Sequence, residues 1–135
     1  MDKSEIRIMV LDDEEGIVFF VKNLLIRKGY GQVFATTNPM EALEHYRKEK
    51  SDICILDVFL GSAHEIDGLK VLAEVKKINP QAVCLMVSRM EEEAIVEKAK
   101  DLGAEKYCFK PIELKNFIET LNSCVDKVLT LKRAV

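Results

Sequence analysis

The chain has 135 residues, of which 48% are hydrophobic and 32% are charged, and its formal net charge is −3. This length suits one domain with a proper core, and this composition is typical of a folded globular protein. The slightly acidic balance excludes nucleic-acid binding through general positive charge, and no apolar run reaches the roughly 18 residues that span a bilayer. The N-terminal stretch turns acidic too soon for a signal peptide, so we expect a cytoplasmic protein.

Four cysteines, Cys54, Cys84, Cys108 and Cys124, stand within apolar or helical stretches of the chain. They show no CxxC spacing and no nearby pair of histidines, so the cysteines indicate neither a cysteine-ligated metal site nor a disulfide framework. We therefore expect four small core residues in a reducing compartment.

Short apolar runs alternate with stretches of helical spacing from the beginning of the chain. Residues 6–11 are predicted to form a first strand. In 14–28 the apolar side chains recur in steps of three and four residues, which predicts a helix that ends at Gly29. A second strand is expected over 32–35.

The second helix has clear signals at its start. Asn38 can cap it, Pro39 suits its first position, and Glu41 stands where a capping box places an acid. This helix is predicted to extend to about Lys50. The remaining elements continue the alternation, with strands at 53–56, 82–87 and 106–109 and helices at 67–78, 91–102 and about 112–131.

Five strand–helix units with short links predict a parallel sheet that is covered by helices on both faces. The strands are continuously apolar rather than alternating, as expected of strands that are buried on both sides. The predicted fold class is therefore α/β, a doubly wound five-stranded sheet in a three-layer sandwich. Residues 1–135 are predicted to be a single domain.

Polar residues stand at the ends of four predicted strands: Asp12 and Asp13 after the first, Asp57 after the third, Ser88 after the fourth and Lys110 after the fifth. In a doubly wound sheet the carboxyl ends of the strands meet at one edge, where ligands bind. Each residue alone has an ordinary explanation as a helix cap, a turn residue or a solvated loop residue. Their joint position favours one shared site.

This set of side chains predicts phosphoryl chemistry that depends on magnesium. Three carboxylates within a few ångströms repel one another unless a hard cation joins them, and Mg²⁺ prefers such oxygen ligands. One carboxylate can then attack phosphorus, while a lysine and a hydroxyl hold the phosphoryl oxygens. Asp57, at the tip of a buried strand, is the predicted acceptor.

The chain resembles a two-component response-regulator receiver domain over essentially its whole length, through the motifs IMVLDDEEGI, ICILDVFLGSAHEIDGLKVL, VCLMVS and GAEKYCFKPIEL. The resemblance implies a flavodoxin-like strand order of 2-1-3-4-5 and phosphoryl transfer to Asp57 from a sensor histidine kinase or a phosphotransfer protein. It implies catalysis of this chain's own phosphorylation and dephosphorylation only. It also implies Mg²⁺ held by Asp12, Asp13, Asp57 and the carbonyl of Phe59.

The same resemblance assigns further roles at the site. Ser88 matches the switch hydroxyl, and Lys110 matches the phosphate-binding lysine before a cis peptide bond to Pro111. Tyr107 matches the switch aromatic, with a half-buried strand tyrosine as its ordinary alternative. Phosphorylation is implied to change the surface of the fourth helix, fifth strand and fifth helix, where a homodimer or a downstream protein binds. Neither nucleic acid nor a membrane is implied as a direct partner.

Three features depart from the family pattern. Gly61 replaces the usual proline after the acceptor, and the segment SAHEI lengthens that loop. Arg89 stands where the family prefers alanine or glycine, and we expect it to shield the phosphoryl group or to pair with Asp57 at rest. The final helix, about 112–131, has a heptad-like seam, which fits an extension towards an output domain or a dimer, or an ordinary amphipathic helix.

Three rival functions share parts of the pattern. A haloacid-dehalogenase-type phosphatase needs an acid two residues after its nucleophile, where this chain has Phe59. A flavodoxin-like cofactor binder needs a Ser/Thr/Gly-rich phosphate loop after the first strand, where the run DDEEG would repel a phosphate. A degenerate receiver that acts only as a protein-binding module stays open because of the altered loop and Arg89, although every acceptor, metal and lysine position is filled.

Overall fold

Five apolar segments form one parallel sheet in the computed structural model, which describes residues 2–133. The strands pair in the order β2-β1-β3-β4-β5, and every neighbouring pair is parallel. The predicted doubly wound sheet and its strand order are therefore confirmed. The strands are β1 (Arg7–Leu11), β2 (Gln32–Thr36), β3 (Ile53–Leu56), β4 (Val83–Ser88) and β5 (Lys106–Phe109).

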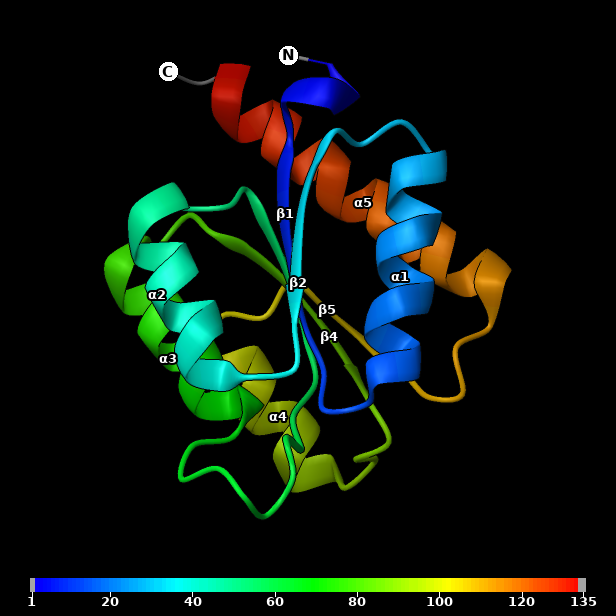
Figure 1. Ribbon diagram of the computed structural model, residues 1–135. Helices are drawn as coiled ribbons and strands as arrows, with labels where there is room; N and C mark the ends of the chain where they lie inside the picture. Colours follow the sequence, from blue (N-terminus) through cyan, green and yellow to red (C-terminus); the bar gives the residue numbers. More distant parts are fainter. Residues whose placement is uncertain (1, 134–135) are drawn as a thin grey trace.

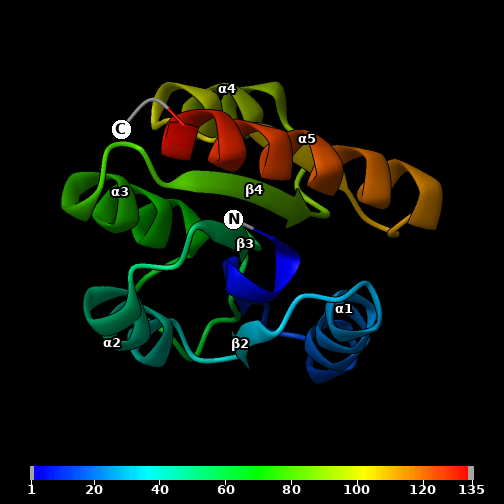
Figure 2. The same ribbon diagram turned by 90° about the horizontal axis from the view of Figure 1, so that it is seen from above.

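Five α-helices cover the sheet, with α1 and α5 on one face and α2, α3 and α4 on the other (Figures 1 and 2). A short 3-10 helix, η1 (Lys3–Glu5), precedes β1 and was not predicted from the sequence. The α-helices are α1 (Glu15–Arg27), α2 (Pro39–Glu49), α3 (Gly68–Ile78), α4 (Glu93–Asp101) and α5 (Leu114–Arg133).

The strands are continuously apolar because each one supplies side chains to two hydrophobic clusters. In β1, Ile8 and Val10 pack in the cluster beneath α1 and α5, whereas Met9 and Leu11 pack in the cluster beneath α2 and α3. The cysteines are divided between the same two clusters and are buried free thiols, as predicted. Burial on both faces leaves the sheet only its edges and strand ends for contact with ligands.

The ends of the helices follow local signals. The Asn38 side chain caps α2 by accepting the backbone N–H groups of Met40 and Glu41. The other half of the predicted capping box does not form, because the Asn38 N–H donates to Thr36 Oγ1 at 3.1 Å. Helices α1 and α4 are followed by glycines with φ of +99° and +105°, a left-handed conformation that glycine adopts without steric cost.

The long helix α5 uses its apolar seam inside the molecule. Leu121, Val125 and Val128 are buried in the cluster against the sheet, whereas Leu114 is 49% exposed. This burial supports the ordinary amphipathic helix, and an extension towards an output domain or a dimer stays a prediction. Within residues 2–133, neither α5 nor any other helix is both long and apolar enough to cross a membrane.

Candidate functional site

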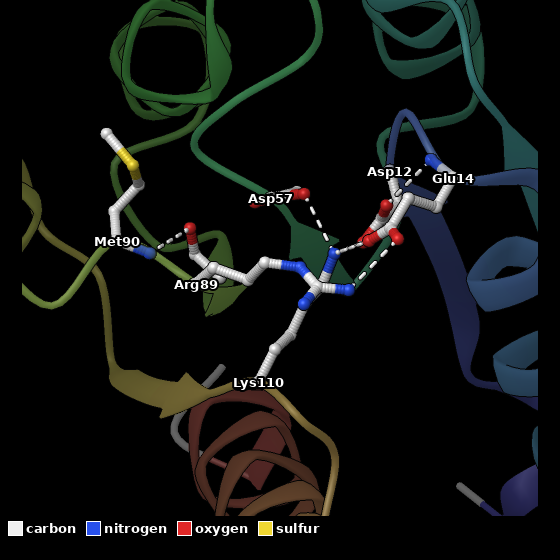
Figure 3. A network of polar contacts seen from close by, with 7 residues as sticks. Asp12, Glu14, Asp57, Arg89, Met90 and Lys110 are labelled. Carbon is white, nitrogen blue, oxygen red and sulfur yellow. Dashed lines mark hydrogen bonds and ion pairs between the residues drawn. The ribbon is translucent and has the colours of Figure 1, made fainter.

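The carboxyl end of the sheet brings together the polar residues that follow its strands (Figure 3). Asp12, Asp57 and Lys110 directly follow β1, β3 and β5, and Ser88 is the last residue of β4. All four are buried, with at most 7% of the residue exposed. Burial of so many polar groups is costly unless they pair with one another or with a ligand. Their placement fits one shared site.

Lys110 is the centre of the contacts at this edge. Its Nζ lies 2.8 Å from Asp12 Oδ2, 2.7 Å from Glu14 Oε2 and 3.0 Å from Asp57 Oδ2. A lysine ammonium has three N–H donors, so these three carboxylates use all of them. Burial by itself would lower the pKa of Lys110, but the three carboxylates raise it above its ordinary value. Lys110 is therefore charged at neutral pH.

The acids at this edge form a set that suits a small hard cation. Asp12, Asp13, Glu14 and Asp57 each offer an oxygen atom, and these atoms lie within 4.8 Å of one another. Burial raises the pKa of Asp12 to about 6, although the hydrogen bond from Lys110 opposes the change. Asp57 Oδ1 is buried and has no hydrogen-bond partner among residues 2–133. An oxygen-rich site with an unpartnered carboxylate oxygen fits the chemistry of Mg²⁺.

Backbone hydrogen bonds to β1 and α3 hold the chain at Asp57, directly after β3. Its own N–H donates to the Leu11 carbonyl at 3.0 Å, which continues the pairing of β3 with β1. The N–H of Gly68, at the start of α3, donates to the Val58 carbonyl at 2.7 Å. Burial raises the pKa of Asp57, and the hydrogen bond from Lys110 opposes that change. Hydrogen bonds thus hold the backbone at Asp57 and Val58, and Lys110 offsets only part of the effect of burial on the pKa of the carboxylate.

Glu14 is a member of this site that the sequence patterns did not single out. Its backbone N–H donates to Asp12 Oδ1 at 2.9 Å, an Asx-type turn between β1 and α1. Its carboxylate contacts Lys110 and Arg89 rather than capping α1. The hydrogen bond from Lys110 lowers the pKa of Glu14 below its usual value. The run DDEEG is a signal for an acidic site, but spacing along the chain does not show that its third acid turns inward.

Arg89 has a different partner from the expected one. Its Nη2 lies 3.1 Å from Glu14 Oε1, and its side chain is 68% exposed. The expected pairing of Arg89 with Asp57 is wrong, because the cation beside Asp57 is Lys110. A buried carboxylate is reached by the buried lysine, while the guanidinium keeps most of its hydration at the mouth of the site.

Ser88 and Tyr107 are joined through one residue, Met90. The Ser88 hydroxyl accepts the Met90 N–H at 3.1 Å, and the Tyr107 hydroxyl donates to the Met90 carbonyl at 2.6 Å. The Tyr107 side chain is half-buried and packs against the cluster beneath α2 and α3, so its ring already points inward. The half-buried tyrosine is thus observed, and its role as a switch stays a prediction.

The remaining predicted residues border a cavity of about 330 Å³ at this edge. Asp57, Ser88, Lys110 and Phe59 line it, together with Arg89. The peptide bond between Lys110 and Pro111 is cis, as predicted. The role of the Phe59 carbonyl as a metal ligand stays a prediction, as do the roles of the other site residues.

Comparison with known proteins agrees with this geometry. The family model of the response regulator receiver domain matches residues 8–122. The chemotaxis protein CheY of Thermotoga maritima is 31% identical over 116 residues, which are 86% of this chain and 94% of that protein. A CheY-like receiver domain protein from Methanospirillum hungatei has the same fold, with a TM-score of 0.85 at 22% identity over 93% of this chain and 97% of that one.

A third protein connects the fold with a modified aspartate. It is a response regulator protein from Burkholderia pseudomallei, whose crystal structure contains a phosphorylated aspartic acid, a calcium ion and citrate. It is 26% identical, with a TM-score of 0.78 over 95% of this chain and 73% of that one. Because the family model spans most of the chain and the fold and the site agree with it, this protein belongs to the response regulator receiver domain family of two-component phosphorelay signalling.

Proposed function

We propose that this receiver accepts one phosphoryl group on Asp57, from a sensor histidine kinase or a phosphotransfer protein, while Asp12, Asp13, Asp57 and the Phe59 carbonyl hold Mg²⁺. The observation that carries the proposal is the state of the Asp57 carboxylate. Lys110 binds Oδ2 at 3.0 Å, whereas Oδ1 is buried without a partner among residues 2–133. The phosphorylated aspartic acid and the calcium ion in the Burkholderia protein support the same chemistry.

The side chains of this edge divide the work of the transfer. A carboxylate oxygen of Asp57 forms a bond to phosphorus while the bond from phosphorus to the donor breaks. Lys110 and Ser88 donate hydrogen bonds to the phosphoryl oxygens as their charge changes. When bound, the metal ion supplies positive charge that draws the phosphoryl oxygens towards the acidic cluster. The chain catalyses only its own phosphorylation and, with water as the acceptor, its own dephosphorylation.

The output of this site is a change in the surface of α4, β5 and α5. A phosphoryl group brings about two negative charges beside Ser88. If Ser88 turns towards it, the Met90 N–H loses its partner, and Tyr107 is bonded to the carbonyl of the same residue. The turn before α4 and the Tyr107 ring on β5 therefore move together. A second copy of the chain or a downstream protein binds the changed surface. The change in free energy between the resting and the switched state is limited by how differently the two states bind the phosphoryl group.

The phosphoacceptor is tested by intact mass measurement. In the presence of Mg²⁺ and a small acyl phosphate donor, the wild type should gain the mass of one phosphoryl group, and Asp57→Asn should gain none, because an amide is not a nucleophile for phosphorus. Fragmentation of the labelled protein should place the group on Asp57. A wild type that takes no phosphate from the donor or a kinase would leave the protein-binding module as the function, and a labelled Asp57→Asn would move the acceptor elsewhere.

Metal binding is tested by thermal unfolding with Mg²⁺ or a chelator. Because a cation relieves repulsion among the acids of the native state, saturating Mg²⁺ should raise the melting temperature by roughly 5 °C. Asp13→Ala should remove most of that rise, since Asp13 belongs to the acidic cluster. Glu15→Ala is the matched control, because Glu15 is an exposed acid in the first turn of α1. An equal rise in all three proteins would place the metal at another site.

A further inference from the structure

One carboxylate holds two cations at the mouth of the phosphoacceptor site. Glu14 Oε2 lies 2.7 Å from Lys110 Nζ, and Glu14 Oε1 lies 3.1 Å from Arg89 Nη2 (Figure 3). The three residues belong to the segments that follow β1, β4 and β5, and Glu14 is 75 residues from Arg89 and 96 residues from Lys110 in the chain. Glu14 therefore ties together three separate loops across the opening above Asp57.

This contact conflicts with the binding of a phosphoryl group. All three N–H donors of Lys110 are used by carboxylates, so a phosphoryl oxygen can bind Lys110 only after one of them leaves. The side chains of Asp12 and Asp57 are 4% and 5% exposed, whereas that of Glu14 is 39% exposed. Glu14 is the carboxylate that can turn into water without leaving a charge buried and unpaired.

Departure of Glu14 also releases Arg89. The guanidinium borders the same cavity as Asp57 and is the residue next to Ser88. With a side chain that is 68% exposed, it is not confined to its present position. Arginine matches phosphoryl oxygens with two parallel N–H donors, so a free Arg89 can bind the group on Asp57 and cover it from water.

We propose, on the basis of the function proposed above, that Glu14 is a resident anion in the place of the phosphoryl group. At rest Glu14 pairs with Lys110 and Arg89. Phosphorylation displaces Glu14, and both cations then bind the phosphoryl oxygens. Glu14 is a positioning residue, because it acts through Lys110 and Arg89 rather than on the reacting atoms. Its charge slows phosphorylation, and Arg89, once released, prolongs the lifetime of the aspartyl phosphate.

The test compares Glu14→Gln, Arg89→Gln, the double variant and the control Glu15→Gln at saturating Mg²⁺. Glu15 is the exposed neighbouring acid, so its variant removes the same charge without touching Lys110 or Arg89. Intact mass gives the initial rate of phosphorylation by a small acyl phosphate and, after removal of the donor, the half-life of the phosphoprotein. Glu14→Gln should be phosphorylated about tenfold faster than the wild type, and Glu15→Gln within about twofold of it.

The half-life supplies a second readout, which reports whether the released Arg89 protects the phosphoryl group from water. Glu14→Gln should keep or lengthen the half-life, whereas both variants that lack Arg89 should shorten it several-fold, with no rescue by Glu14→Gln. The gain in rate should also shrink as salt is added, since it arises from charge at a partly exposed residue.

Four outcomes would overturn the proposal. An unchanged rate in Glu14→Gln, or an equal gain in Glu15→Gln, would show that Glu14 does not compete for the cations. An unchanged half-life in Arg89→Gln would show that the guanidinium does not reach the phosphoryl group. A wild type without any phosphoryl uptake would refute the proposed function, and this inference with it, whereas the first three outcomes in a labelled protein refute this inference alone.

Discussion

Lys110→Met is expected to lower the free energy of unfolding by about 3–5 kcal/mol near neutral pH, because it leaves the buried carboxylates of Asp12 and Asp57 without a counterion. The Lys110 side chain is 1% exposed and contacts Asp12, Glu14 and Asp57. Methionine fills a similar volume but neutralises none of them. Since domains of this size are stable by about 5–15 kcal/mol, the loss is a large part of the total.

The effect of Lys110→Met should depend on pH in a defined direction. Burial raises the pKa of Asp12 to about 6 and also raises the pKa of Asp57, so the native state binds protons more tightly than the unfolded chain does. Groups of this kind destabilise the native state increasingly as the pH rises from their unfolded values towards their folded values. Lys110 lowers both pKa values, so Lys110→Met should raise them further. The loss of stability that it causes should therefore be larger at about pH 8 than at about pH 5, where the buried acids take up protons.

Urea unfolding at the two pH values, in a chelator, gives both free energies. Lys132→Met is the matched control, because the Lys132 side chain is 54% exposed and lies 3.5 Å from Asp52. The control should change stability by at most about 1 kcal/mol, as exposed ion pairs do. Equal losses in the two variants, or a loss from Lys110→Met that does not grow with pH, would show that the carboxylates of the site relax into solvent.

Gly68→Ala is the second change with a large expected effect, and it acts on the backbone that carries the acceptor. A Cβ at Gly68 would lie 1.7 Å from the carbonyl oxygen of Asp57 and 2.9 Å from Val58 Cα. Both atoms belong to the backbone, so no side-chain rotation relieves the clash. We expect a loss of about 3 kcal/mol or more in the free energy of unfolding. The N-terminus of α3 must then move away from β3, which also displaces Asp57.

Phosphorylation reports that displacement separately from stability. A shift of the acceptor by about 1 Å costs roughly 100-fold in rate, so labelling of Gly68→Ala should fall by about that factor even where the protein remains folded. Gly16→Ala is the matched control, because a Cβ at Gly16, near the start of α1, meets nothing within 4 Å. It should be neutral or stabilising by up to about 1 kcal/mol. Normal stability and labelling of Gly68→Ala would contradict the close approach of α3 to β3.

The layered fold follows from patterns that act over a few residues. Strands that are buried on both faces are short continuous apolar runs, whereas apolar side chains of a helix recur at three- and four-residue steps, and both patterns are visible in this chain. Strands β3 and β5 were predicted at their observed bounds, while α4 begins at Glu93 and α5 at Leu114, two residues later than expected. Helix starts are less certain because several polar residues near them can serve as caps.

The gathering of Asp12, Asp57, Ser88 and Lys110 was also predictable, for a topological reason. In a parallel sheet every strand ends at the same edge, so residues that directly follow strands meet there whatever their distance in the chain. The structure places these residues together and buries them. Sequence position relative to a strand end was sufficient, because the strand carries the residue to its place.

Only the tertiary structure decided the contacts of side chains that lie in the loops of this edge. Glu14 stands three residues beyond the end of β1 and pairs with Lys110 and Arg89, which are 96 and 75 residues away. Neither contact can be predicted from helical spacing or from the position of a strand end. Each depends on how two loops turn and on which acid remains closest to water. For the same reason Arg89 pairs with Glu14 at the mouth of the site, while Asp57, buried at the tip of β3, is left to Lys110.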